Sequence, residues 1–70
     1  MIPLTYADMG RDVVIKKIGG KSEVRTHLEN LGFVAGSSIK VISSLSGNLI
    51  VNVKESRVAI SKEMAAKIMV

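Results

Sequence analysis

The chain has 70 residues, with 10 lysines and arginines against 6 aspartates and glutamates, and so carries a net charge of +4. This length predicts one domain over residues 1–70, and the absence of cysteine excludes disulfides and thiolate zinc sites. No apolar run approaches the roughly 20 residues of a membrane span, so we expect no membrane insertion. The N-terminus does not resemble a secretion signal, and we expect a cytoplasmic protein.

The first part of the chain predicts a helical turn followed by a strand. Thr5 and Asp8 have the spacing of a capping box, which predicts one turn of helix with Leu4 and Met9 pointing inward. Residues 12–18 then alternate apolar and polar side chains for most of their length, which is the period of a β-strand. A glycine pair ends this strand.

A helix of about nine residues is the clearest element of the sequence. Ser22 is a suitable N-cap, and apolar residues follow at helical spacing on one face. These residues are Val24, Leu28 and Leu31. Gly32 suits the left-handed position after the helix, and Phe33 is then placed to pack back on Leu28, as in a Schellman ending.

Three short strands are predicted in the second half, over residues 38–45, 49–54 and 57–60. Gly47-Asn48 is a strong signal for a tight turn between the first two. Glu55-Ser56 is a weaker signal, but the spacing leaves room only for a hairpin. The second half of the chain is therefore predicted to form a meander of three antiparallel strands.

The end of the chain predicts a helical turn and a last short strand. Ser61 is placed to cap a turn over residues 62–67. The residues that this turn presents to the core are Met64 and either Ala65 or Ala66. Residues 68–70 are too few to stand alone and should pair with the edge of the first strand, which closes the sheet.

These elements together predict a mostly β protein. We expect an SH3-like small five-stranded partly open barrel, with one inserted α-helix and a short helical turn before the last strand.

No constellation of catalytic residues is apparent, and we expect a protein that is not an enzyme. His27 is the only histidine, and we interpret it as a solvated helix residue beside Glu23. Metal ligation by Glu23 and His27 is an alternative, although two ligands at helical spacing make only half a site. General-base catalysis by His27 is a third alternative. We expect no cofactor.

Basic residues gather around the end of the first strand and the start of the helix, which raises the alternative of a small basic barrel that binds nucleic acid. They are Lys16, Lys17, Lys21 and Arg25. Binding of single strands by barrels relies on aromatic side chains that stack on bases, and here Tyr6 and Phe33 are the only aromatic residues. We therefore interpret the lysines as solvated surface and expect no nucleic acid.

Two segments resemble a known family. The run from Leu28 to Val41 resembles the pattern L-x-x-L-G-[aliphatic/Phe]-x-x-G-x-x-[Ile]-x-[Val] of the FeoA-like proteins, the ferrous iron transport protein A family. The run from Arg57 to Val70 is similar to that family's closing pattern of strand, helical turn and strand. The resemblance covers residues 4–70.

The resemblance implies an SH3-like domain of the bacterial cytoplasm. Such a domain assists a membrane transporter of ferrous iron by contact with the transporter's GTPase portion. Transition-metal binding is sometimes attached to this domain type, so a weak Fe²⁺ site is an alternative, as is a metal-sensing role. The segment Ser44–Asn48 departs from the family, since many members have a longer Pro/Gly-rich loop there.

We expect the helix and the loop after it to contact the partner, because they combine apolar groups with a guanidinium, a mixture common at interfaces. The residues are Arg25, Leu28, Leu31 and Phe33. If the apolar members are buried in the core, the exposed side chains of the same helix would recognise the partner instead. These are Arg25, Thr26, His27 and Asn30. We expect a monomer or a weak homodimer.

Overall fold

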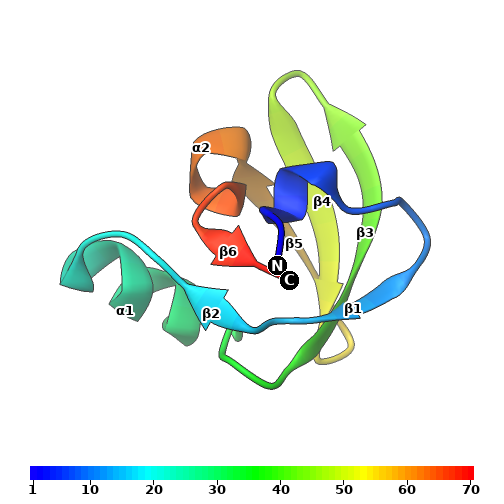
Figure 1. Ribbon diagram of the computed structural model, residues 1–70. Helices are drawn as coiled ribbons and strands as arrows, with labels where there is room; N and C mark the ends of the chain where they lie inside the picture. Colours follow the sequence, from blue (N-terminus) through cyan, green and yellow to red (C-terminus); the bar gives the residue numbers. More distant parts are fainter.

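Four strands form an antiparallel sheet in the order β1–β3–β4–β5 in the computed structural model, which describes residues 1–70 (Figure 1). The bounds of these strands are Asp12–Val14 for β1, Ser38–Leu45 for β3, Asn48–Val53 for β4 and Ser56–Ser61 for β5. The register between β3 and β4 shifts between Val41 and Ser43. Such a bulge bends a strand and increases its twist, which lets a small sheet curl around its core.

A second, smaller sheet pairs β2 (Lys17–Ile18) with β6 (Ile68–Met69). The prediction that the last strand pairs with the end of the first is therefore confirmed. The N-terminal segment of the same chain lies along β6 as a third extended segment of this sheet, which the sequence did not predict. Ile2 N–H donates to the Val70 carbonyl at 2.9 Å and Val70 N–H donates to the Ile2 carbonyl at 2.8 Å, so the two termini lie side by side (Figure 1).

The predicted strand over residues 12–18 is divided into β1 and β2, which makes six strands in place of five. Between them, Ile15 bonds to the loop before β3: its N–H donates to the Ser37 carbonyl at 2.9 Å, and its carbonyl accepts from Gly36 N–H at 2.8 Å. The strand divides because its two halves pair with different partners, β3 and β6. The barrel stays partly open, since β5 and β6 are joined by a helix and do not pair.

The core consists of 12 buried residues, and none of them is polar or charged. They are Leu4, Ile15, Leu28, Phe33, Ile39, Val41, Leu49, Val51, Val53, Ile60, Ala65 and Ile68. Apolar packing, aliphatic except for Phe33 and supplied by segments from Leu4 to Ile68, therefore holds the fold.

The first helical turn differs from its prediction in two respects. It is a short 3₁₀ helix, η1, over Leu4–Tyr6, and its N-cap is Pro3 with no side-chain bond, so the predicted capping box of Thr5 and Asp8 is wrong. Leu4 is buried as predicted, but Met9 is 58% exposed. Met9 lies beyond the end of η1, in the turn before β1, and so does not share the inward side of the helix.

Both hairpin turns lie one residue earlier than predicted, at Ser46–Gly47 and Lys54–Glu55 in place of Gly47–Asn48 and Glu55–Ser56. All four turn residues have positive φ, from 48° to 83°. Two-residue turns of this kind match the right-handed twist of the strands they join.

Helix α1 spans Ser22–Asn30, and its C-terminal end has the predicted geometry. Gly32 has φ of 105°, its N–H donates to the Glu29 carbonyl at 3.0 Å, and Phe33 N–H donates to the Leu28 carbonyl at 2.9 Å. This pair of bonds is a Schellman ending. The N-cap is Lys21 and not Ser22. The backbone is extended only as far as Lys21, so Ser22 is already the first residue of the helix.

Helix α2 spans Lys62–Ala65, and Ser61 caps it as predicted: the Ser61 hydroxyl oxygen accepts from Met64 N–H at 3.2 Å. Of the two alanine candidates, Ala65 is fully buried, whereas Ala66 is exposed. Met64 is half-buried against the core.

Candidate functional site

Helix α1 projects from the side of the barrel (Figure 1). Leu28 is its only buried residue, and Val24 is half-buried, so most of the helix surface faces solvent. A helix in a small domain is usually held by a whole apolar stripe. Here the only fully buried side chain is in the last turn, and Val24 packs partly against the core from the first turn, while the other side chains of the helix are exposed.

The structure separates the predicted partner-binding residues into two groups. Arg25 is exposed and Leu31 is half-buried, so both can be reached from outside. Leu28 and Phe33 have no exposed surface, and the prediction that they touch a partner is wrong. They are buried because the Schellman ending folds the chain back over the last turn and places both side chains in the core.

The alternative set of residues on α1 fits the structure better, since Arg25, Thr26, His27 and Asn30 are all exposed. They do not form one surface, however, because the helix turns by about 100° per residue. Arg25 lies with Glu29, while Thr26, His27 and Asn30 line a different hollow.

A hollow of about 270 Å³ lies where β2, α1 and the loop after α1 meet. Its lining residues are Ile18, Arg25, Glu29, Val34 and Ala35. Neither Arg25 nor Glu29 forms a salt bridge, although they are one helical turn apart. The hollow thus offers one positive group, one negative group and three apolar side chains at the surface.

Sequence reasoning identified Arg25 in this hollow and missed the other four residues. The spacing of Arg25 and Glu29 at i, i+4 is a signal that both lie on one side of the helix. The remaining residues come from β2 and from the loop beyond Phe33, and only the folded chain brings them to the helix.

Glu23 and His27 lie together on the other exposed side of α1, on a polar hollow of about 440 Å³. The remaining lining residues are Ser22, Thr26 and Asn30. No group of three histidine, cysteine, aspartate or glutamate side chains in the chain could hold a metal ion. The two candidates therefore supply two donors and leave a closed four-ligand site incomplete.

The charged side chains all lie at the surface, and no polar side chain is buried. Two salt bridges are formed, between Arg11 and Asp8 at 3.5 Å and between Lys40 and Asp12 at 4.0 Å. Catalytic acids and bases are commonly held in partly buried clusters that alter their proton affinity. The structure brings together no such cluster.

The two aromatic residues occupy contrasting positions. Tyr6 is 75% exposed on η1, whereas Phe33 is fully buried. One exposed ring does not make the row of stacking platforms on which barrels bind single strands. None of the three helices has the length and apolar character that crossing a membrane requires.

The two small sheets that curl around one apolar core define a small SH3-like β domain with one exposed helix. Residues 2–70 match the FeoA family, described as FeoA domain. The chain is 39% identical over 70 residues to "Putative Fe(2+) transport protein A" of Methanocaldococcus jannaschii, and the match covers 100% of this chain and 85% of that protein. The chain belongs to the FeoA family.

Solved structures agree with this assignment. A crystal structure of an iron uptake regulatory protein, FeoA, is 30% identical with a TM-score of 0.87, over 96% of this chain and 89% of that one. FeoA of Stenotrophomonas maltophilia, crystallised with zinc and described as a procaryotic SH3 domain protein, has a TM-score of 0.84 at 19% identity, over 99% and 88%. The latter likeness shows the fold, which confirms the predicted SH3-like architecture.

Proposed function

We propose that this protein is a non-enzymatic accessory factor of ferrous iron transport, which acts in the cytoplasm by docking on the GTPase region of a membrane transporter. The name of the 39% identical relative supports the link to Fe²⁺ transport. The match over residues 2–70 supports a role carried by the FeoA domain itself.

The observation that carries the docking role is the exposure of α1, which presents Arg25 and Glu29 beside the hollow. Interfaces commonly combine an apolar contact with a charged group, and arginine is among the side chains most enriched there. Ile18, Val34 and Ala35 provide the apolar contact here. A partner segment with an apolar side chain flanked by a carboxylate would fit this surface.

The test is a binding measurement between this protein and the purified cytoplasmic GTPase region of the ferrous transporter from the same organism. Arg25→Glu is expected to weaken binding by at least about tenfold, because it places a second carboxylate beside Glu29 and against an acidic group of the partner. The matched control is Arg57→Glu, which makes the same change of charge at an exposed position on β5. Equal binding by the two variants would show that the hollow beside α1 is not the docking site.

The proposal includes no resident metal ion. Glu23 and His27 offer only two donors, and a helper that docks on a transporter can act without holding the ion itself. Titration with Fe(II) or Zn(II) is expected to show no stoichiometric binding at micromolar concentration. Stoichiometric binding that His27→Ala abolishes would favour the metal-binding alternative.

A further inference from the structure

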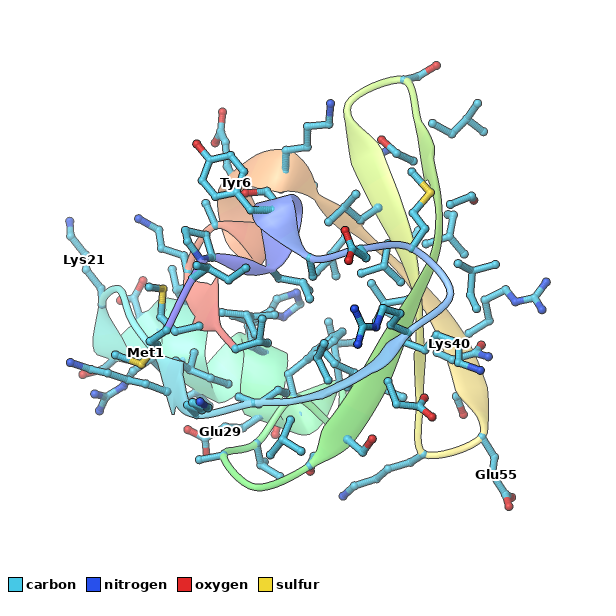
Figure 2. The ribbon with its side chains drawn as sticks, turned by 45° about the vertical axis from the view of Figure 1, so that its right-hand side comes forward. Met1, Tyr6, Lys21, Glu29, Lys40 and Glu55 are labelled. Carbon is cyan, nitrogen blue, oxygen red and sulfur yellow. The ribbon has the colours of Figure 1, made fainter.

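Basic side chains gather on one face of the sheet formed by the N-terminal segment, β6 and β2. We define the basic surface as Lys17, Lys21 and Lys67 together with Met1 and Met69. All three lysines are exposed, Met1 is 69% exposed and Met69 is half-buried. Figure 2 shows Lys21 and Met1 at the same side of the molecule, with Lys40 and Glu55 at the opposite side.

Strand pairing places these residues on one face. Lys17 lies opposite Met69 in the β2–β6 pair, and Met69 lies opposite Pro3 in an isolated bridge. Residues directly opposite one another in antiparallel strands point to the same side. Met1 is two residues before Pro3, so the alternation of an extended chain returns it to that side. Lys67 lies in the turn before β6, and its position is given by its contacts with Gly19 and Gly20.

The same face continues onto the start of α1. Gly19 N–H donates to the Lys67 carbonyl at 2.7 Å, which extends the pairing of β2 and β6 by one step. A Cβ placed on Gly20 would lie 3.3 Å from Cδ of Lys67. The Lys67 side chain therefore runs along Gly20, and Lys21 follows directly.

The segments around this surface carry most of the protein's net charge. Residues 16–30 together with Lys67 contribute five basic residues and two carboxylates, a net +3 of the whole chain's +4. The basic residues are Lys16, Lys17, Lys21, Arg25 and Lys67, and the carboxylates are Glu23 and Glu29. Both salt bridges of the molecule lie elsewhere, so none of the five cations is ion-paired.

Lys21 is unfavourable for the helix that it precedes. It occupies the N-cap of α1 and makes no side-chain cap bond. Its cation lies at the end of the helix that carries the partial positive charge, where an acidic or hydroxyl side chain would be stabilising. A residue that departs from a local rule without a gain in stability often serves binding.

We propose that the basic surface binds the anionic phospholipid headgroups of a membrane, so that the protein attaches peripherally. Three unpaired cations on one face attract a negative lipid surface, and each contributes about fivefold to affinity at moderate salt. Met1 and Met69 lie among them and can contact the upper part of the acyl region. The surface contains no aromatic ring, since Tyr6 lies on η1, so base stacking has no platform here.

The experiment measures co-sedimentation of the full chain with vesicles at about 0.1 M salt. One set of vesicles is phosphatidylcholine with about one-third phosphatidylglycerol, and the other is phosphatidylcholine alone. We expect binding to the anionic vesicles only, and a loss of binding as the salt concentration rises.

Two double variants test the location of the binding surface. Lys21→Glu/Lys67→Glu and the control Arg57→Glu/Lys62→Glu each lower the net charge from +4 to 0, and all four positions are exposed. The first variant is expected to lose at least about 25-fold in vesicle affinity, whereas the control retains most of it. Should the first variant fail to fold, Lys21→Gln/Lys67→Gln replaces it, with Arg57→Gln/Lys62→Gln as its control.

Equal losses in the two double variants would overturn the proposal, because net charge and not this surface would then govern binding. Equal binding to neutral vesicles, or tighter binding to RNA or duplex DNA than to anionic vesicles at the same phosphate concentration, would also overturn it. The vesicles contain no transporter, so a negative result leaves the proposed docking by Arg25 unaffected, and a failure of that docking leaves this result unaffected.

Discussion

The two α-helices of this protein are attached to the barrel in opposite ways. Helix α2 has four residues, is capped by the Ser61 hydroxyl and has Ala65 fully buried against the barrel. Helix α1 has nine residues, lacks a side-chain cap and has only Leu28 buried. The shorter helix is thus the better integrated one, although isolated helices gain stability with length.

The difference predicts different roles for the two helices. Helix α2 links β5 to β6 and packs on β4, β5 and η1, so its residues maintain the barrel. Helix α1 has its one buried residue, Leu28, in its last turn, and from its earlier turns only Val24 packs partly against the core. A substitution on α2 should therefore change stability, and one on the exposed side of α1 should change binding.

The largest expected effect is at the anchor of α1. Leu28→Ala should lower the free energy of unfolding by about 2–5 kcal/mol, because Leu28 has no exposed surface and its truncation leaves a cavity. Denaturant unfolding measures the loss. Leu31→Ala, at a half-buried position one turn further, should cost clearly less. A loss below about 1 kcal/mol for Leu28→Ala would mean that burial of Leu28 does not hold α1 on the barrel.

The second-largest effect on stability is expected at the N-cap of α2. Ser61→Ala should lower the free energy of unfolding by about 1 kcal/mol, since it removes the acceptor of Met64 N–H. Ser22→Ala on α1 is the matched control, because Ser22 lies inside the helix and caps nothing. Thermal unfolding of the two variants should differ, and equal melting temperatures would contradict the contrast between the two N-termini.

The N-cap of α1 should respond in the opposite direction. Lys21→Asp supplies an acceptor and a negative charge at the positive end of the helix, and should raise the free energy of unfolding by about 0.5–1 kcal/mol. The same variant should bind anionic vesicles less well than the unaltered protein. A variant that is more stable but binds vesicles as well as the unaltered protein would show that Lys21 does not contribute to vesicle binding.

The smallest effect is expected on the polar side of α1. His27→Ala replaces an exposed side chain that has no hydrogen bond or salt bridge, so stability should change by less than about 0.5 kcal/mol. Chemical denaturation of the variant and of the unaltered protein under the same conditions measures this difference in stability. A larger loss would show that the exposed side of α1 contributes to the fold after all.

Local features of the fold were predictable because they depend on neighbours in the chain. Gly32 and Phe33 end α1 as predicted, since the left-handed position favours glycine and the next residue returns to the core. Ser61 caps α2 for a similar reason. The meander from β3 to β5 was predicted with its turns displaced by one residue, because its register depends on strand twist as well as on turn residues.

Features that join distant segments were not predictable in the same way. The N-terminal segment pairs with β6 although Pro3 and Met69 are separated by almost the whole chain. The strand over residues 12–18 divides because its halves have different partners. The sequence left both a partner-binding and a core position open for Leu28 and Phe33, and their complete burial decides for the core.

The sequence by itself determined the class of fold, the end of α1, the cap of α2 and the resemblance to the FeoA family, because each depends on the order of a few nearby residues or on a linear pattern. The tertiary structure decided which side chains remain exposed, and it assembled the hollow beside Arg25 and the basic surface around Met69. Both surfaces combine residues far apart in the chain, and their proximity arises only when burial of the aliphatic core brings β2, β6 and α1 together.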